Sequence, residues 1–187
     1  MRGMREVVAH MLATINEMGD VARLGMGQTL QLEREDVAAL ARRVVEEYGM
    51  GPLSGPDAPR VEIDAPAEAI VTHGDPYRLL RVLHNLIGNA VKYSAGTQAR
   101  GAPVHVEARA REGWAVIVVT DGGVGIPADE LPRVFTRFFR ASTSRGVKGT
   151  GIGLSGSRSI VEQHGGSINI ESMAGQRTTV TMRLPLM

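Results

Sequence analysis

The 187-residue chain contains no cysteine, which excludes a disulfide scaffold, thiolate zinc sites and cysteine catalysis together. Long apolar runs are also missing. The aliphatic stretch Ala115 to Val119 has five residues, whereas a membrane span needs ~18. Nothing at the N-terminus reads as a signal peptide, so we expect a soluble, cytoplasmic protein without membrane contact of its own. A net charge of +1 argues against nucleic acid as a partner, because nucleic-acid clamps carry a basic stripe.

Lysine is the other scarce residue, since 19 of the 21 basic residues are arginines and only Lys92 and Lys148 are lysines. A lysine that persists against such a bias indicates a position where a compact, mobile ammonium group is useful. The length predicts one domain, or one domain plus a piece of another. A chain of this size buries enough surface to fold without a metal or a disulfide.

The first 24 residues predict one amphipathic helix, because Val7, Met11, Ile15 and Met18 recur at three- and four-residue spacing. Glycines at 25 and 27 end it. Such a helix is either the first layer of this core or one half of a helical hairpin whose other half is missing. We favour the hairpin, which divides the chain into residues 1–27 and a domain over residues 28–187.

The remaining chain interleaves helical and strand patterns. Helices are predicted at residues 36–48, 75–93, 130–135 and 153–164, with Asp75 as an N-cap before Pro76 in the first turn. Strands are predicted at residues 29–33, 60–63, 69–72, 104–110, 114–120, 167–172 and 178–184. The strand at 114–120 is apolar on both faces and therefore central. Adjacent hairpins make the sheet partly antiparallel, so the predicted fold class is a two-layer α/β sandwich, not a doubly wound fold.

Asn85, Asn89 and Lys92 form the first candidate site, because they fall within an arc of ~60° on one predicted helix. Two neutral amides and one ammonium group can hold a hydrated cation and a phosphate without the repulsion of carboxylates. Asparagine is unusual on a helix surface, since it competes with the backbone for hydrogen bonds. A helix face that is exposed to solvent and binds nothing explains the three residues equally well.

A second candidate, Asp121 to Pro127, follows the predicted central strand with three glycines in four residues. A carboxylate at the end of a buried strand can accept a hydrogen bond from an exocyclic amine, and glycines let a flat ring approach the backbone. A wide turn explains the segment equally well, because Asp-Gly is itself a turn signal.

The third candidate, Lys148 to Leu154, opens a predicted helix. Bare amides and the helix dipole attract anions there, and Lys148 adds a mobile charge. A flexible glycine hinge is compatible with this role. The same segment matches the dinucleotide fingerprint at Gly151, Gly153 and Gly156, but no predicted strand precedes it, which disfavours a dinucleotide oxidoreductase.

The fourth candidate, residues 134–140, holds all three phenylalanines of the chain. Core packing is the prediction for Phe135. For Phe138 and Phe139 two interpretations stay open, namely core packing or the base of a mobile lid with Arg137 or Arg140 facing phosphates.

In their order and spacing these segments resemble the catalytic and ATP-binding domain of bacterial sensor histidine kinases, within the GHKL superfamily of gyrase, Hsp90 and mismatch-repair ATPases. Residues 85–93 are similar to its N box, 121–127 to its G1 box, 135–140 to its F box and 149–154 to its G2 box. The resemblance covers about residues 28–187. It implies a Bergerat-type sandwich with a mixed sheet and three helices on one face, preceded by a helix from a dimerisation hairpin.

The resemblance also implies ATP and Mg²⁺ as cofactors. Asp121 would accept from the adenine amine, Asn89 would bind the metal, and Asn85, Lys92 and Lys148 would be catalytic. The implied nucleotide-binding residues are Asn85, Asn89, Lys92, Tyr93, Asp121, Gly123, Gly125, Ile126, Arg140, Lys148, Gly149, Thr150, Gly151, Ile152, Gly153, Leu154 and Thr178.

The implied reaction transfers the γ-phosphoryl group of ATP to a histidine on a separate dimerisation hairpin of the same or a partner chain. A response regulator would be the further partner, and the full-length protein would be a homodimer. The ATPase branch of the superfamily has a glutamate at the position of Asn85, which favours a kinase. No phosphoacceptor box is present, because His10 is followed by Met11 rather than by an acid.

Two departures from the family pattern stand out. Gly156 and Ser157 occupy positions that are usually apolar, and Arg177 replaces a usual glycine. These residues could weaken helix docking or the adenine pocket, so the alternative function is a degenerate nucleotide-binding module with weak or no transfer. A serine kinase of the anti-sigma type, which shares the fold, is a further alternative.

Overall fold

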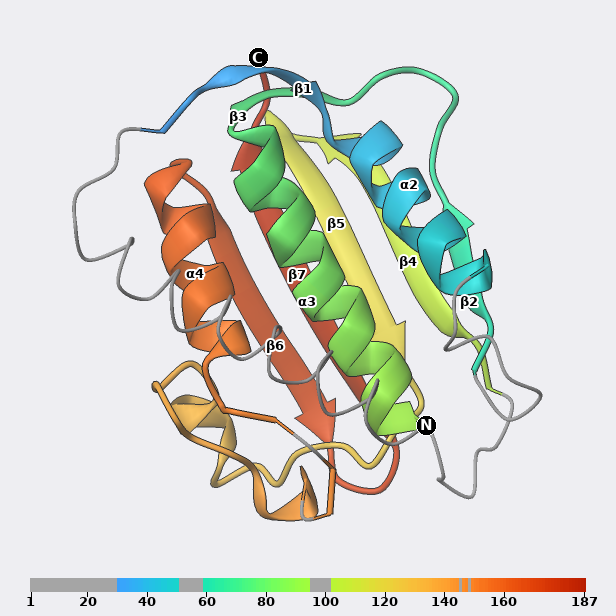
Figure 1. The fold of residues 1–187 in the computed structure, drawn as a ribbon, viewed down its shortest axis with the longest axis vertical. Helices are drawn as coiled ribbons and strands as arrows, with labels where there is room; N and C mark the ends of the chain where they lie inside the picture. The colour runs from blue at the N-terminus through green and yellow to red at the C-terminus, as the bar shows by residue number, and fades with distance from the viewer. Residues whose placement is uncertain (1–29, 51–58, 95–101, 145, 148) are drawn as a thin grey trace, which may run out of the picture.

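A computed structural model describes residues 30–50, 59–94, 102–144, 146–147 and 149–187 (Figure 1). The helix and hairpin predicted for residues 1–27 lie outside this part. In chain order the helices and strands are β1 (Glu33–Asp36), α2 (Val37–Met50), β2 (Val61–Asp64), β3 (Val71–Gly74), α3 (Pro76–Ser94), β4 (Val104–Arg111), β5 (Trp114–Asp121), α4 (Gly153–Gln163), β6 (Ser167–Met173) and β7 (Arg177–Pro185). Among the described helices, none is both long and apolar enough to cross a membrane.

Five strands form one mixed sheet in the order β2-β4-β5-β7-β6. β2 runs parallel to β4, and the other neighbours are antiparallel. β4 and β5 are joined by the two-residue turn Glu112–Gly113, and both residues have positive φ, as a type I′ hairpin requires. β5 lies in the middle of the sheet, which confirms the prediction from its two apolar faces.

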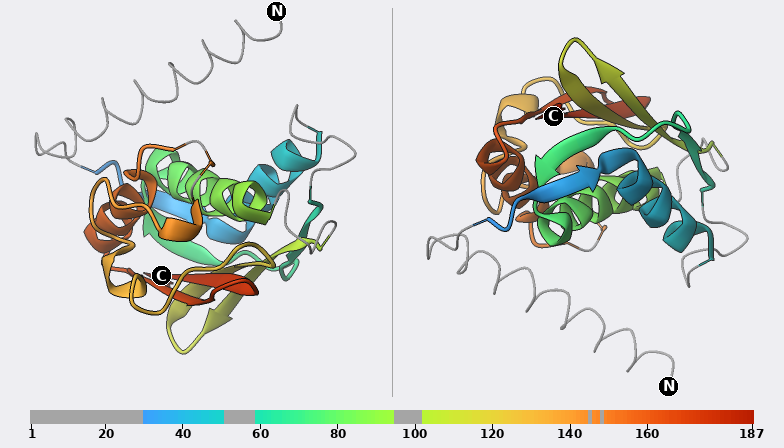
Figure 2. Two further views of the ribbon diagram at one scale, coloured as in Figure 1. Left: turned by 90° about the horizontal axis from the view of Figure 1, so that it is seen from below. Right: turned by 90° about the horizontal axis from the view of Figure 1, so that it is seen from above.

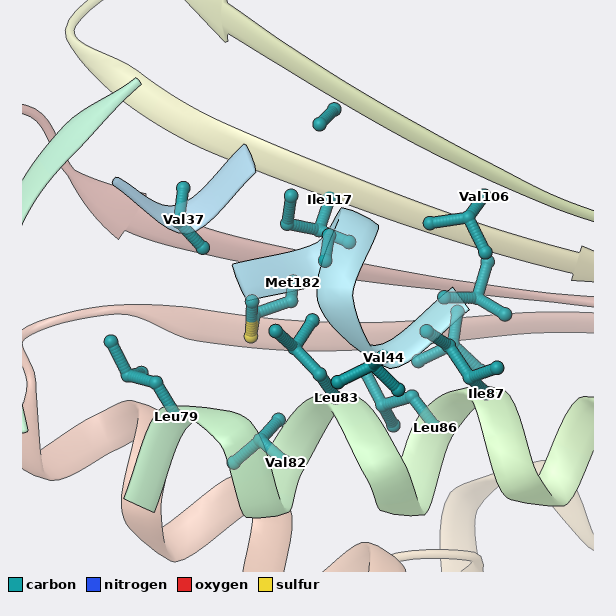
Figure 3. Close-up of a cluster of buried hydrophobic side chains, with 14 of the residues drawn as sticks. Val37, Val44, Leu79, Val82, Leu83, Leu86, Ile87, Val106, Ile117 and Met182 are labelled. Carbon is teal, nitrogen blue, oxygen red and sulfur yellow. The ribbon is translucent and has the colours of Figure 1, made fainter. Parts of the chain in front are cut away.

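Helices α2, α3 and α4 pack side by side on one face of this sheet (Figures 1 and 2). The leucine stripe of α3 points at the strands, where Leu83 and Leu86 meet side chains such as Ile117 and Met182 (Figure 3). No described helix covers the other face, and Trp114, Val116 and Val118 are therefore only half-buried there. The two-layer α/β sandwich with three helices on one face is confirmed.

The N-terminus of α3 begins as its sequence predicts. Asp75 accepts a hydrogen bond from the Arg78 backbone N–H at 3.2 Å, which is the N-cap geometry, and Pro76 occupies the first turn. The sequence predicted its end at Tyr93, one residue short of the observed Ser94.

Two predicted strands are displaced along the sequence, and one predicted helix is of another type. β1 occupies residues 33–36 instead of 29–33, and β3 occupies 71–74 instead of 69–72. The cause is Asp36, whose Oδ1 atom accepts the backbone N–H groups of both Ala38 and Ile70 at 3.0 Å. β1 therefore runs to Asp36, directly before α2, and the Ile70 N–H donates to a side chain instead of to a neighbouring strand. The helix predicted at 130–135 is a 3₁₀ turn, Leu131–Arg133.

His164 joins the C-terminus of α4 to the N-terminus of α3. It is 7% exposed. Its Nε2 atom accepts the Asp75 backbone N–H at 2.9 Å. Nε2 is therefore unprotonated, and Nδ1 carries the proton that is donated to the Ile160 carbonyl at 2.7 Å. The sequence indicated only that a helix ends at this histidine.

We expect His164→Leu to lower the free energy of unfolding by about 1–3 kcal/mol, because it leaves the buried N–H of Asp75 without an acceptor. Urea unfolding measures the change. His105→Leu, at an exposed position of β4, is the matched control and should stay within about 0.5 kcal/mol. Equal unfolding midpoints for the two variants would contradict this role of His164.

Candidate nucleotide-binding site

A cavity with a volume of about 150 Å³ lies between α3, the ends of β5 and β7 and the segments that follow β5. In Figure 1 these segments form the yellow-to-orange loops below α4. Fourteen of the predicted binding residues line the cavity: Asn85, Asn89, Lys92, Tyr93, Asp121, Gly125, Ile126, Arg140, Gly149, Thr150, Gly151, Gly153, Leu154 and Thr178. Gly123 and Ile152 lie outside its lining, and Lys148 lies outside the described residues.

Asp121 closes one end of the cavity as the last residue of β5, with 6% exposure. Burial raises the pKa of its carboxyl group from 3.8 to about 6, although the Gly123 N–H donates to Oδ1 at 2.8 Å and opposes the shift. A Cβ atom at Gly123 would lie 2.5 Å from that oxygen and 2.6 Å from the Tyr93 carbonyl. Gly123 therefore supports Asp121 from outside the cavity.

Ser172 on β6 connects three parts of this end, and the sequence did not indicate it. Its hydroxyl donates to the Arg177 carbonyl at 2.8 Å and accepts the Ile126 N–H at 2.9 Å. Since its only proton is used, the Thr178 hydroxyl, 2.9 Å away, is the donor of the pair. Arg177 has no positive φ, so the residue that replaces a usual glycine takes part without backbone strain.

The two asparagines of α3 form a polar seam at the other end of the cavity. The Asn89 Nδ2 group donates to the Asn85 Oδ1 atom at 3.4 Å, and the Asn85 Nδ2 group donates to the Ser157 hydroxyl on α4 at 2.8 Å. A Cβ atom at Gly153 would lie 2.1 Å from Asn85 Oδ1. Helix α4 thus begins directly against the asparagine seam, and Ser157 is buried in the interface between the helices.

The glycine-rich segment before α4 also borders the seam. A Cβ atom at Gly149 would lie 2.9 Å from the Lys92 Nζ atom, which is 5.3 Å from the centre of the Tyr93 ring. Gly151 has φ +75° and its carbonyl accepts the Phe138 N–H at 2.9 Å. Gly149 therefore brings the backbone of this segment close to the ammonium group of Lys92.

The phenylalanines divide differently from the prediction. Phe135 is half-buried under the Arg158 guanidinium rather than part of the core, while Phe139 lines the cavity. Phe138 is 68% exposed at a positive φ of 65°. Arg137 is exposed.

Arg140 holds the segment that follows the phenylalanines. Its guanidinium donates to the carbonyl groups of Ser144 and Val147. The Thr143 hydroxyl donates to the Gly125 carbonyl at 2.7 Å, which joins this segment to the Asp121 end of the cavity. Arg140 therefore bridges the backbone carbonyls of Ser144 and Val147, beside Tyr93. Burial raises the pKa of the Tyr93 phenol, and the Arg140 charge opposes part of that shift.

The donor set fits a magnesium ion that keeps most of its water. Within the described residues no cluster of three or more histidine and carboxylate side chains exists that could hold a metal by itself. The seam instead offers neutral amide oxygens beside an ammonium group and helix amides. Mg²⁺ is commonly bound through one or two protein oxygens together with substrate phosphates, so the arrangement suits a metal that arrives with a nucleotide.

Comparison with known families identifies the domain. Residues 74–187 match the family described as "Histidine kinase-, DNA gyrase B-, and HSP90-like ATPase", which is more than half of the chain. The chain belongs to this family. It is the catalytic ATPase domain of the sensor histidine kinase type, and the resemblance inferred from the four boxes is confirmed.

Relatives of this ATPase domain are sensor kinases of two-component systems. The chain is 32% identical to the sensor protein kinase WalK of Staphylococcus saprophyticus over 97% of its own length and 29% of the relative. It is 31% identical to the sensor histidine kinase YkoH of Bacillus subtilis, over 93% of this chain and 36% of that protein. The chain therefore spans about a third of the length of the curated relatives it matches.

Solved histidine kinases share the ATPase-domain fold. Full-length ShkA, crystallised in complex with AMPPNP, superposes with a TM-score of 0.77 at 29% identity, over 99% of this chain and 38% of that one. The mycobacterial sensor histidine kinase MprB gives a TM-score of 0.69 at 29% identity, over 82% of this chain and 98% of that one. The dinucleotide interpretation of Gly151 to Gly156 loses its support, because the loop before α4 contains no described strand.

Proposed function

We propose that this domain binds Mg-ATP and transfers the γ-phosphoryl group to a histidine on a separate dimerisation hairpin. The observation that carries the proposal is the pairing of opposite chemistries in one cavity. A buried carboxylate, Asp121, lies at one end, and two amides, an ammonium group and the start of helix α4 lie at the other. ATP has a matching amine at one end and a charged triphosphate at the other.

At the adenine end, Asp121 would accept a hydrogen bond from the exocyclic amine. Tyr93, Ile126 and Thr178 line the same part of the cavity and would contact the ring. Gly125 has φ +61°, and a Cβ atom there would lie 2.1 Å from the Met173 carbonyl, so the loop beside the ring keeps its shape only with glycine. Gly123 would act through Asp121, as its hydrogen bond indicates.

At the phosphate end, Asn89 would hold Mg²⁺ through its side-chain oxygen, and Asn85 would support metal and phosphates. Lys92 and Lys148 would neutralise phosphate charge, and Arg140 would join them after its hydrogen bonds to the Ser144 and Val147 carbonyls break. The amides of Gly149, Thr150, Gly151, Ile152, Gly153 and Leu154 would bind phosphate oxygens at the helix N-terminus. Mg²⁺ held there would supply charge neutralisation for the phosphates.

In the proposed reaction a ring nitrogen of the acceptor histidine attacks the γ-phosphorus. A nitrogen–phosphorus bond forms, the bond between the γ-phosphorus and the bridging oxygen breaks, and ADP leaves with that electron pair. Positioning and charge neutralisation carry such a transfer. Asn85 favours transfer over hydrolysis, because an amide does not accept a proton from water as a carboxylate base does.

The wider assembly belongs to the proposal as well. Residues 1–27 would be a remnant of the hairpin's second helix, and residues 28–187 the catalytic domain. The full-length protein would be a homodimer that passes the phosphoryl group to a response regulator, as its relatives' names as sensor kinases suggest. The domain would work at the cytoplasmic end of a larger sensor.

Transfer in trans tests the function. With Mg-ATP the domain should label a family phosphoacceptor hairpin with an acid-labile, base-stable phosphate, and a hairpin without its histidine is the control. Binding of ATP with no transfer to the acceptor hairpin would favour the degenerate module instead. Calorimetric titration with ATP, ADP and NAD, each with and without Mg²⁺, separates binding from turnover, and NAD bound more tightly than ATP would overturn the proposal.

We expect Asn89→Ala to remove most of the affinity that Mg²⁺ adds to ATP binding, by about tenfold, and to leave metal-free binding within twofold. The reason is that Asn89 provides a neutral oxygen ligand in a seam without carboxylates. Calorimetry at several Mg²⁺ concentrations measures the ATP affinity with and without the metal. Asn169→Ala, at an exposed position of β6, is the control, and parallel losses with and without Mg²⁺ would refute the metal role.

Adenine binding should depend on pH through Asp121. Its pKa in the nucleotide-free fold is about 6, so the acceptor is protonated below that pH and ATP affinity should fall by up to about tenfold per pH unit. Phosphate groups of ATP titrate in the same region. Asp121→Asn isolates their contribution, and equal slopes between pH 5 and 7 for both proteins would exclude the carboxylate as the titrating group.

A further inference from the structure

Helix α4 buries one hydroxyl group against the asparagine seam. Ser157 is 3% exposed and lies on the same face as Ile160 and Val161, which enter the core. Its Oγ atom accepts the Asn85 Nδ2–H at 2.8 Å across the interface between α3 and α4. A polar residue at such a position satisfies a buried amide that an apolar side chain would leave unpaired.

The hydrogen bonds of the seam run in one direction. Asn89 Nδ2 donates to Asn85 Oδ1, and Asn85 Nδ2 donates to Ser157. With its nitrogen turned toward Asn85, the Asn89 amide does not direct its oxygen at the Asn85 side chain. Because the two ends of each amide are coupled in this way, a hydroxyl that accepts at the end of this series of hydrogen bonds favours the observed orientation of both amides.

Gly153 has no side chain and so leaves room for this series of hydrogen bonds. The position of its missing Cβ atom is 2.1 Å from Asn85 Oδ1 and 3.3 Å from Asn85 Nδ2. The first turn of α4 therefore confines the Asn85 amide, while Ser157, one turn further along, gives it a partner. Both features belong to α4 and neither depends on a bound ligand.

We propose that Ser157 is a positioning residue for the metal-nucleotide site: through Asn85 it orients the Asn89 amide so that the side-chain oxygen is available to Mg²⁺. The inference rests on the proposed function, because it assigns a further residue to the same site. Groups that hold a metal ligand in place typically change metal affinity by about 10- to 100-fold when they are removed. The serine at position 157, where the family usually has an apolar residue, then orients the metal ligand and does not weaken the packing of α4.

The test compares Ser157→Thr with Ser157→Val, since threonine and valine have the same shape and only threonine keeps the hydroxyl group. We expect Ser157→Val to reduce the Mg²⁺-dependent gain in ATP affinity about tenfold, with metal-free affinity unchanged within twofold. Ser157→Thr should keep most of the Mg²⁺-dependent gain in ATP affinity. In the nucleotide-free protein, the side-chain amide resonances of Asn85 and Asn89 should shift in the valine variant and stay close to wild type in the threonine variant.

Ser155→Ala on the same helix is the control, because the Ser155 hydroxyl donates to the Ile152 carbonyl within the helix end and not to the asparagine seam. A full Mg²⁺-dependent gain in Ser157→Val would overturn the inference, as would equal losses in the threonine and valine variants or parallel losses without metal. Absence of Mg²⁺-dependent ATP binding in the wild-type chain would instead refute the proposed function itself. The two failures are therefore distinguishable.

Discussion

Asp121→Asn is expected to weaken ATP binding about 100-fold, the largest effect of any single side chain in the cavity. A hydrogen bond to a charged acceptor contributes about 1.5–3 kcal/mol, and a buried one lies at the upper end. If the asparagine keeps the Gly123 N–H on its oxygen, as Asp121 does at 2.8 Å, its NH₂ group faces the adenine amine. Two donors would then oppose each other, which adds to the loss.

The same substitution should stabilise the nucleotide-free protein. The carboxyl of Asp121 ionises near pH 3.8 in the unfolded chain and near 6 in the fold, so the folded state binds more protons between these values. Stability therefore falls as pH rises through this window, and above pH 6 the ionised carboxylate costs on the order of 2 kcal/mol. A neutral asparagine avoids that cost at pH 7 and gives no benefit at pH 4.

Urea unfolding at pH 4 and pH 7, together with ATP titration at pH 7.5, checks both halves of the prediction. Asp129→Asn, at an exposed position in the following loop, is the matched control and should change neither quantity. Unchanged ATP affinity in Asp121→Asn would remove this residue from the adenine site. Lost affinity accompanied by lower stability at pH 7 would show a structural role in place of a binding one.

Periodic patterns predicted most of the fold, because they report directly on burial. The stripe of Leu79, Leu83 and Leu86 placed α3, and the apolar run of β5 placed a central strand. The errors fall where a side chain replaces a backbone partner. Asp36 accepts the N–H of Ile70, which ends one ladder and starts a helix, and no local periodicity reports a contact between residues 34 positions apart.

The candidate site was predicted through residues that are unusual for their local structure. Asparagines on a helix, glycines after a strand and two lysines among many arginines each departed from expectation, and Asn85, Asn89, Lys92 and Gly125 from these groups line one cavity. Ser172 and His164 were missed, because a single serine in an alternating strand and a histidine at a helix end are both ordinary. Their partners lie 46 and 89 residues away along the chain.

Ser157 was detectable but was interpreted differently. It stood out as a departure that could weaken the docking of α4. A serine on a buried stripe without a known partner predicts a loss of stability, because burying an unpaired hydroxyl costs free energy. Its partner is an amide on another helix, so the interaction required the packing of α3 against α4 to be visible. Gly156, the neighbouring departure, has no described atom within 4 Å of an added Cβ atom and does not line the cavity.

The second large effect is expected at the two glycines of α4, which lie one turn apart. Alanine should lower phosphoryl transfer at Gly153 but only stabilise the helix at Gly156. We expect Gly153→Ala to reduce phosphoryl transfer about 100-fold, since its Cβ atom would lie 2.1 Å from Asn85 Oδ1 and the amide must leave its place between Asn89 and Ser157. At Gly156 no atom of the described residues lies within 4 Å of an added Cβ atom, so alanine should stabilise the helix by about 0.5–1 kcal/mol without changing transfer.

Initial rates of hairpin labelling and urea midpoints, measured for both variants, separate the two effects. Asn85 can yield by rotating its side chain, so the Gly153→Ala fold should stay within about 1 kcal/mol of wild type while its site is disrupted. Wild-type labelling by Gly153→Ala would show that the asparagine seam is dispensable for transfer. A comparable loss of labelling in Gly156→Ala would show that α4 responds to any added methyl group, and the effect at Gly153 could then no longer be assigned to Asn85.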